Sequence, residues 1–572
     1  MRHAIEAVVA DAIAAAVHSG ELALPYVPEA TVERPRDPSH GDWACTVALR
    51  IAKELGRNPR EIAEVVAAHI PHNDLIASVE IAGPGFINLR LSNAALQRVM
   101  RDAREQGADF ARSDVGEGRT VNIEFVSANP TGPMHVGHGR WAALGNAMCN
   151  VCEHAGWKVT REFYVNDAGN QMDVFGHSVA LRYLELLGVP IVMPEASYGG
   201  AYVRDIAQHI LDDEGDVWRD EDEALRDAHF RERGLEAMLV RMQELCERVG
   251  VPFDVWFSER SLYERGEDGA SPIERMLAAL QEGGYLYEKD GATWFRTTDF
   301  SDDKDRVLIK ADGTYTYFAP DIAYHLSKFE RGSEFLVDIW GADHHGYVPR
   351  MRSACEALGH GGGFDVVLGQ LVNLFRDGEA VRMSKRTGEM VTFEELVEEV
   401  GADATKYLML NRSTDQPLDF DIEVAKKQDA SNPVYYVQYA HARICSLLRK
   451  AGEAVCQGDV CQGDVSGDTL DPLGLDAADL GLLADPSELA LARTFSQFGE
   501  VVEGAAHDLA PYRLTRYAEE LATGFHSFYT RCHIIDPAVP ELTRARLYLA
   551  DAARSVLALV LTLLGVTAPE RM

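Results

Sequence analysis

A strand–loop–helix–strand pattern in the second hundred residues constrains the fold of this chain more than any other feature. The apolar run RTVNIEFVSA (119–128) predicts a buried strand, a helical pattern follows at 140–155, and a second strand is expected at 158–165. This order is that of a parallel βαβ unit. The β/α alternation resumes at 335–346 and 364–375, so we expect an α/β fold with a Rossmann-like parallel sheet.

Three regions differ in their pattern of apolar residues and predict three domains. Residues 1–112 predict an α+β N-terminal domain, residues 113–430 the α/β domain, and residues 431–572 an all-α C-terminal domain. We expect a mostly helical, acidic insertion at about 166–310 and an acidic, Gly/Asp-rich loop at about 452–486. In the N-terminal domain the pattern predicts helices at 4–18, 42–55, 59–70 and 93–106, and two strands that turn at 83–85.

Charge and cysteine content limit the class of protein. The net charge of −35 disfavours nucleic acid as a partner. Acidic residues are concentrated in segments such as 212–227, so a local basic face for RNA is not excluded. The sequence contains no uncharged apolar stretch long enough to predict a membrane span. We expect a cytoplasmic protein. Cys149 and Cys152 form a CxxC without a second pair at zinc-site spacing, so no metal site is predicted.

Two histidines three residues apart follow the first strand of the βαβ unit, in the stretch ANPTGPMHVGHGRWAALG (128–145). A helix start offers unpaired N–H groups and a positive dipole end, which favour an anion. Gly137 and Gly139 permit close approach of the backbone, and His135 and His138 lie on one helical face. Imidazole donors aimed at a phosphoryl group can stabilise the charge that develops in its transition state.

The same letters also fit a dinucleotide-binding loop. Gly137-x-Gly139-x-x-Ala142 matches that fingerprint, and Glu162 lies about where a ribose-binding acid would be. The fingerprint does not require two histidines, and its turn is tighter than this one. An NAD-dependent dehydrogenase therefore stays open as an alternative.

A second polar loop favours phosphate chemistry over the dinucleotide alternative. The stretch DGEAVRMSKRTGEMV (377–391) places Lys385 between Arg382 and Arg386, ahead of a helix with a capping box from Thr392 to Glu395 and an end at Gly401. Clustered cations suit a polyphosphate leaving group, whose charge grows as its bond breaks.

The two loops together resemble the HIGH and KMSKS signatures of class I aminoacyl-tRNA synthetases. More specifically, EFVSANPTGPMHVGHGR (124–140) resembles arginyl-tRNA synthetases. Three further stretches are similar to that family, namely HGDWACTVALRIAKELGRNPREIA, NPVYYVQYAHARICSLLR and the closing LGVTAPERM. The first signature stands here as histidine-Val-Gly-histidine (135–138), and Arg382 stands where the second has its first lysine.

The resemblance implies roles for individual residues. His135, Gly137 and His138 would bind ATP, with both histidines stabilising the α-phosphate, and Lys385 would neutralise the outer phosphates in a loop shaped by Met383 and Ser384. The residues expected to contact arginine are Glu124, Asn129, Tyr317, Asp321 and, more weakly, Asp343. A guanidinium is best held by carboxylates and aromatic faces, which supports the acids and the tyrosine independently.

The implied reaction has two steps and two macromolecular contacts. Arginine attacks Mg·ATP to give arginyl-adenylate, and the arginyl group passes to the terminal ribose 2′-OH of tRNA(Arg). The N-terminal domain would touch the outer corner of the tRNA and the C-terminal helices its anticodon, with Tyr435, Tyr436 and Tyr439 as stacking candidates. The resemblance also implies a monomer and a first step that needs bound tRNA. A non-catalytic RNA-binding paralogue stays open as a second alternative.

Overall fold

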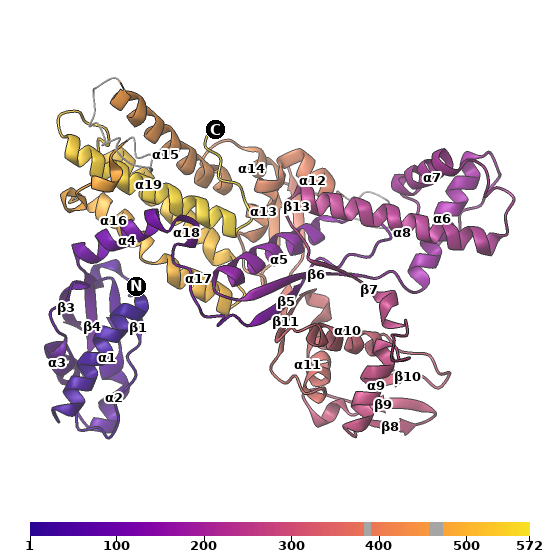
Figure 1. Ribbon diagram of the computed structural model, residues 1–572, viewed down its shortest axis with the longest axis horizontal. Helices are drawn as coiled ribbons and strands as arrows, with labels where there is room; N and C mark the ends of the chain where they lie inside the picture. The colour runs from indigo at the N-terminus through magenta and orange to yellow at the C-terminus, as the bar shows by residue number, and fades with distance from the viewer. Residues whose placement is uncertain (382–390, 457–472) are drawn as a thin grey trace.

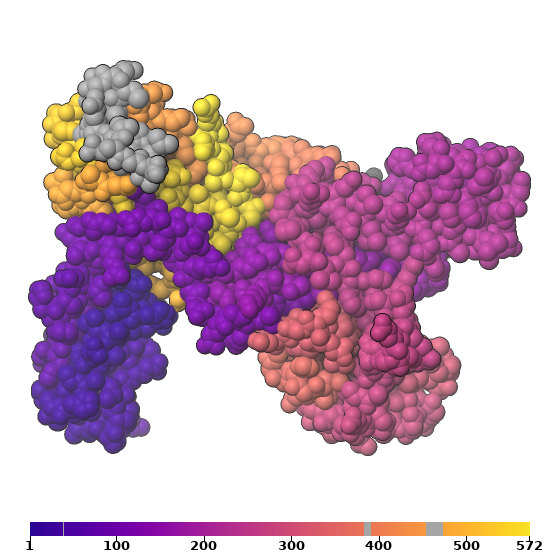
Figure 2. Space-filling view, in the orientation of Figure 1, coloured from indigo at the N-terminus to yellow at the C-terminus, as the bar shows by residue number. Residues whose placement is uncertain are grey.

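The computed structural model describes residues 1–381, 391–456 and 473–572. The chain forms three domains in the order predicted, and the N-terminal domain is attached to the body through one end (Figure 1). Figure 2 shows an open notch between that domain and the α/β domain. No helix among the described residues is both long and apolar enough to cross a membrane.

The N-terminal domain combines four helices with an antiparallel sheet of order β1-β2-β4-β3. Its elements are α1 (Arg2–His18), β1 (Val32–Glu33), β2 (Trp43–Cys45), α2 (Val47–Leu55), α3 (Pro59–His69), β3 (Ile76–Ala82), β4 (Phe86–Leu91) and α4 (Asn93–Glu105). The helix expected at 42–55 is wrong in its first turn, because Trp43 and Cys45 pair with β4 and bury their side chains there. α4 ties the domain to the C-terminal helices through Arg104, which lies 2.9 Å from Asp551.

The α/β domain is built on a parallel sheet of order β12-β11-β5-β6-β7. Its elements up to the end of that sheet are β5 (Thr120–Glu124), α5 (Val136–His154), β6 (Lys158–Val165), α6 (Asn170–Leu186), α7 (Ala201–Glu214), α8 (Glu223–Arg248), β7 (Val255–Ser258), α9 (Pro272–Glu282), β8 (Leu286–Lys289), β9 (Ala292–Phe295), β10 (Arg306–Ile309), α10 (Phe318–Glu330), β11 (Phe335–Gly341), α11 (Val348–Ala357) and β12 (Phe364–Gly369). α5 and α10 lie on opposite faces of the sheet (Figure 1).

The remaining elements are those that follow this sheet in the chain, up to and including the C-terminal helices. They are β13 (Val372–Arg376), β14 (Glu379–Ala380), α12 (Phe393–Val400), α13 (Ala402–Leu410), β15 (Leu418–Asp421), α14 (Ile422–Lys426), α15 (Pro433–Cys456), α16 (Pro486–Phe495), α17 (Phe498–His507), α18 (Tyr512–Arg531) and α19 (Pro540–Leu563). From 431 onward the described residues contain helices and turns and no strand, as predicted. The capping box from Thr392 to Glu395 and the helix end at Gly401 are also confirmed.

Three expected boundaries in the α/β domain differ from the structure. β5 ends at Glu124 instead of continuing to 128, because Val126 and Ser127 adopt positive φ angles of 69° and 39°. α5 begins at Val136, earlier than expected, since His135 caps it. The segment 166–310 is helical up to Arg248, but β7 then joins the central sheet, where Trp256 stacks on Phe163.

The acidic loop expected at 452–486 is shorter than predicted in its described part. α15 continues to Cys456, and the turns at Leu475–Ala477 and Leu480–Leu482 bury Leu475 and Leu480. Residues 457–472 lie outside the described residues.

Candidate active site

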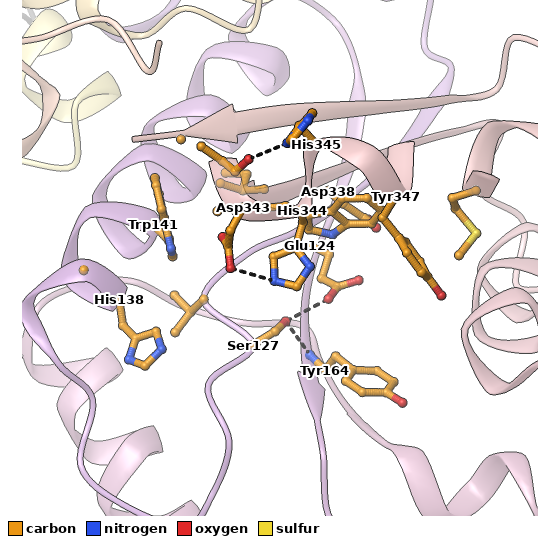
Figure 3. Close-up of a pocket in the computed structure, with 18 of the residues that line it drawn as sticks. Glu124, Ser127, His138, Trp141, Tyr164, Asp338, Asp343, His344, His345 and Tyr347 are labelled. Carbon is orange, nitrogen blue, oxygen red and sulfur yellow. Dashed lines mark hydrogen bonds and ion pairs between the residues drawn. The ribbon is translucent and has the colours of Figure 1, made fainter. Parts of the chain in front are cut away.

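A cavity of about 1220 Å³ opens at the carboxyl ends of β5, β11 and β12, where ligands bind in open parallel sheets. Figure 3 shows its lining, with His138 and Trp141 at one end and Glu124, Asp338 and Tyr347 at the other. Elements more than 200 residues apart in sequence therefore contribute to one space.

The first end is the histidine loop, which we define as residues 125–138: the connection from β5 to α5 and the first residues of α5. His135 is the N-cap of α5, and its Nδ1 accepts a hydrogen bond from the backbone N–H of His138 (3.4 Å). In return, Nδ1 of His138 accepts from the backbone N–H of His135 (3.1 Å), and the two rings stack with centroids 3.6 Å apart. Since Nδ1 of each ring is an acceptor, the proton of each neutral ring lies on Nε2. The loop thus provides two Nε2–H donors at the lining of the cavity.

The two glycines of the histidine loop and helix have different surroundings. A Cβ on Gly139 would lie 2.4 Å from the ring of Phe393, the first residue of α12, so only a glycine permits this packing. A Cβ on Gly137 would meet the ring of His135. The backbone N–H of Phe393 donates to the carbonyl of Met134 (2.8 Å), and His135 pairs with Thr392 as an isolated antiparallel bridge. The histidine loop is thereby fixed to the start of α12.

Arg140 and Trp141 hold the wall beside the histidines. Arg140 is fully buried and donates to the backbone carbonyls of Ser413 (3.0 Å), Gln416 (3.1 Å) and Gln370 (2.7 Å), and burial lowers its pKa to about 10. Trp141 packs so closely on the end of β12 that a Cβ on Gly369 would overlap its ring. These contacts fix α5 relative to β12.

The second end of the cavity is the acidic end, which we define by Glu124, Asp321, Asp338 and Tyr347. Asp321 lies in the first turn of α10, and Tyr347 donates its hydroxyl to the Asp321 carboxylate. Burial raises the pKa of Asp321 to about 6; the Tyr347 hydrogen bond opposes this, and the charges of Glu124 and Asp338 add to it. Asp321 is not a helix cap, because Tyr317 occupies that position.

The other residues expected to contact arginine are placed unequally. Tyr317 lines the cavity with 90 % of its surface exposed, and Asp343 lines it from the turn Ala342–Tyr347, close to His344 (3.6 Å). Asn129 is exposed, does not belong to the lining, and donates to Gln171 (3.1 Å). Lys385, Met383, Ser384 and Arg382 lie outside the described residues.

Sequence reasoning missed two groups at the acidic end, Tyr347 and the buried pair of Asp338 with Lys328. Lys328 donates to Glu124 (2.6 Å) and to Asp338 (2.9 Å). A signal for the lysine exists in the spacing of Asp321, His325 and Lys328, which fall on one face of a helix at i, i+4 and i+7. Tyr347 carries no comparable signal, because a 3₁₀ turn brings it to the cavity.

The dinucleotide-binding interpretation predicts that Glu162 binds a ribose, and this prediction is wrong. Glu162 is fully buried and accepts hydrogen bonds from Nη1 (2.9 Å) and Nη2 (2.7 Å) of Arg331. It does not line the cavity, so it is not placed to receive a ribose. Cys149 and Cys152 are buried on α5, and burial raises the pKa of Cys152 to about 12, which disfavours the thiolate that a metal requires.

The three tyrosines at the start of α15 are placed differently from one another. Tyr435 and Tyr439 stack with ring centroids 5.9 Å apart, and Tyr439 is exposed at the surface. Tyr436 is half-buried, packs on His526 and hydrogen-bonds to Thr523, which makes it a packing residue. Tyr439 also lines a surface hollow with Arg443, Arg449, Lys450 and Arg571.

Comparisons with known proteins agree over the whole chain. Three family models match it, described as the arginyl tRNA synthetase N terminal domain (residues 3–91), the tRNA synthetases class I (R) catalytic domain (103–445) and the DALR anticodon binding domain (437–572). The arginine--tRNA ligase of Bacillus subtilis is 45 % identical over 98 % of this chain and 97 % of its own length. That of a Geobacter species is 45 % identical over the full length of both chains. Among solved structures, the arginyl-tRNA synthetase of Thermus thermophilus has the same fold, with a TM-score of 0.73 and 23 % identity over the whole of both chains.

Proposed function

Since this chain belongs to the family of class I arginyl-tRNA synthetases, we propose that ATP binds at the histidine loop and arginine at the acidic end of the cavity. The protein is an ATP-dependent ligase that activates arginine and charges tRNA with it. The observation that carries the assignment of its site is that one cavity joins paired imidazole donors to a buried carboxylate. Neither a dehydrogenase nor a non-catalytic paralogue accounts for both ends.

At the histidine loop, His135 and His138 present two donors to the α-phosphate. The carboxylate of arginine attacks the α-phosphorus, the bond to the bridging oxygen of pyrophosphate breaks, and arginyl-adenylate forms. The Nε2–H donors stabilise the charge that develops on the equatorial phosphoryl oxygens, and their rings are already oriented by the mutual capping box. Gly137 leaves room for the ring of His135 in this orientation, because a Cβ at that position would meet the ring.

At the acidic end, Asp321 accepts from the guanidinium of arginine, and Tyr347 orients it. Glu124 binds the α-ammonium group of arginine. Tyr317 and Asp343 border the pocket on its exposed side. Asn129 keeps its predicted role only if it leaves Gln171 and turns toward the cavity. A neutral amino acid would leave buried carboxylates unpaired, and this cost provides selectivity.

Lys385, with Met383 and Ser384, is proposed to neutralise the β- and γ-phosphates as pyrophosphate departs. Thr392, which follows this segment closely in the chain, pairs with His135. This pairing supports the proposal, because it brings the end of the segment next to the histidine loop. Mg²⁺ would be held by the phosphates of ATP itself and would partly neutralise their charge; we assign no residue of this chain to it.

In the second step, the 2′-OH of the terminal ribose of tRNA(Arg) attacks the arginyl carbonyl, and AMP leaves. For the tRNA itself, we propose that Tyr435 and Tyr439 stack on unpaired bases and that the neighbouring arginines contact phosphates. A monomer acting in the cytoplasm, where tRNA is charged for translation, completes the proposal.

Pyrophosphate–ATP exchange across all twenty amino acids, each with and without total tRNA, tests this function. We expect exchange with arginine alone and only when tRNA is present. Exchange with a different amino acid would keep the histidine loop as the ATP site and discard the proposed arginine pocket. Exchange with no amino acid under any condition would contradict the catalytic assignment.

A further inference from the structure

Three buried carboxylates form a row across the central sheet. Asp338 of β11 is in register with Glu124 of β5, and Glu124 is in register with Glu162 of β6. Residues in register on parallel strands point to the same face, so the three side chains lie side by side under α10. All three are buried, with exposed fractions of 1 %, 8 % and 0 %. Adjacent buried carboxylates are costly unless cations accompany them.

α10 supplies those cations from one face. Lys328 donates to both Glu124 (2.6 Å) and Asp338 (2.9 Å), and His325 lies 2.8 Å from the other oxygen of Asp338. One turn further along, Arg331 forms a bidentate pair with Glu162. Each carboxylate of the row thus has a partner on α10 or at its C-cap.

Only part of this row of carboxylates and cations lines the cavity. Glu124, Asp338 and His325 line the cavity, whereas Glu162, Lys328 and Arg331 do not. Lys328 is fully buried behind the two carboxylates that it binds. It therefore cannot contact a substrate and can act on one only through Glu124 and Asp338.

The second oxygen of Glu124 is also occupied, because Ser127 donates to it (2.9 Å). Lys328 and Ser127 together fix the plane of this carboxylate at the floor of the cavity. We propose that Lys328 is a positioning residue for arginine, which holds the carboxylates of Glu124 and Asp338 oriented at the acidic end. The inference rests on the proposed arginine pocket and deepens it.

The groups around Lys328 come from every element packed on it. Glu124, Asp338 and Glu162 face it from the sheet, the ring of Tyr324 lies 4.3 Å from its ammonium, and buried Cys355 of α11 is also close. Burial alone would raise the pKa of Asp338, but Lys328 and then His325 outweigh it and lower that pKa to about 2. Without the ammonium, two adjacent buried carboxylates would share a proton.

The variant Lys328→Met tests the proposal through the KM for arginine in aminoacylation. We expect that KM to rise roughly tenfold or more, because the floor of the pocket loses charge and orientation, while the KM for ATP stays unchanged. The carboxylate pair would take up a proton at a higher pH than in the parent. The rise of arginine KM on acidification should therefore begin at higher pH, and Lys328→Arg should restore part of the parent profile.

Arg331→Met is the matched control, since it removes the neighbouring cation of the same helix from a carboxylate outside the cavity. It should lower the Tm and leave the arginine KM unchanged. If Lys328→Met lowers the Tm in the same way with parent KM and pH profile, Lys328 is only a structural residue and the proposal is overturned.

Glu124→Gln separates this inference from the proposed function. An unchanged arginine KM in Glu124→Gln would contradict the pocket itself, whereas a raised KM there together with a parent KM in Lys328→Met would contradict only the role of Lys328. If Lys328→Met does not fold, the double variant Lys328→Met/Glu124→Gln removes cation and anion together. We expect its arginine KM to exceed that of Glu124→Gln alone, because Asp338 also loses its cation, and equal KM values for the two variants would overturn the proposal.

Discussion

The histidine loop and the acidic end of the same cavity differ in how their parts are brought together. In the histidine loop, two side chains three residues apart cap each other's backbone and fix their own rings. At the acidic end, the partners come from β5, α10, β11 and the turn after β11, and 204 residues separate Lys328 from Glu124. The first geometry depends on one helix start, and the second depends on the register of the whole sheet.

Because the two ends are assembled differently, substitutions in them should affect different properties, namely the rate of activation and the binding of arginine. A locally fixed donor pair acts on the reacting phosphate, so its loss should appear in the rate of activation. A pocket assembled from distant elements acts on substrate binding and on stability, so its loss should appear in the KM for arginine and in unfolding. Three substitutions test whether the two ends are independent in this way.

The largest effect is expected from His138→Ala. Loss of one donor to the charged phosphoryl group should lower tRNA-dependent pyrophosphate–ATP exchange by roughly 10²–10³-fold, with little change in the affinity for tRNA. Rates from exchange and a Kd from filter binding measure the two quantities.

His138→Asn serves as its control, because an amide can still accept the hydrogen bond from the N-cap backbone but offers no imidazole. If His138→Asn retains the parent rate, the histidine acts only as a cap and not in the chemistry.

The next effect is expected at Asp321. Asp321→Asn should raise the KM for arginine by roughly 10–150-fold, because a hydrogen bond to a charged group contributes about 1.5–3 kcal/mol. The rate at saturating arginine should fall much less. Initial rates of aminoacylation over a range of arginine concentrations measure both.

The pH dependence of arginine binding gives a second test of the same residue. The pKa of Asp321 is raised to about 6, so below pH 6 the carboxyl is increasingly protonated and offers no charge to the guanidinium. The Kd for arginine, measured by calorimetry, should rise as pH falls through 6, approaching about tenfold per pH unit. Asp321→Asn should lack this dependence, and its persistence in that variant would assign the titration to another group.

The smallest effect on activity, and a clear one on stability, is expected from Gly139→Ala. The added Cβ would lie 2.4 Å from the Phe393 ring, and overpacking of this kind lowers the free energy of unfolding by about 1–3 kcal/mol. Thermal unfolding measures it. Gly199→Ala, where a Cβ meets no atom within 4 Å, should change it little; equal Tm values for the two variants would argue against tight packing of the histidine loop on α12.

The sequence predicted the locally encoded end well and the assembled end only in part. The domain order, the βαβ unit and the pairing of two histidines at a helix start follow from periodicity and from motifs that are contiguous in the chain. The mutual capping of the rings was not predicted, because an imidazole is an unusual helix cap. Val126 and Ser127 have positive φ angles, which end β5 early. The sequence does not predict this, because neither valine nor serine is a residue type that favours positive φ.

At the acidic end, the resemblance predicts Glu124, Asp321 and Tyr317 as arginine contacts, and all three line the cavity, but it gives no role to Lys328. Its role depends on which strands are neighbours, and sheet order is not written in the spacing of residues along the chain. Asn129 shows the converse, since its motif suggested a contact that the loop geometry directs toward Gln171. β7 was missed because four residues are too few for a period of two to be distinguished.

The central position of β5 also has a consequence for synthesis of the chain. β5 pairs with β6 as soon as the first βαβ unit is complete, but its other neighbour, β11, begins about 210 residues after β5 ends. At about 5–20 residues per second, the ribosome leaves that edge open for roughly 10–40 s. An unpaired strand edge is a site for wrong pairing. The nascent chain should therefore depend most on chaperones between the emergence of β5 and that of β11, long before the anticodon domain exists.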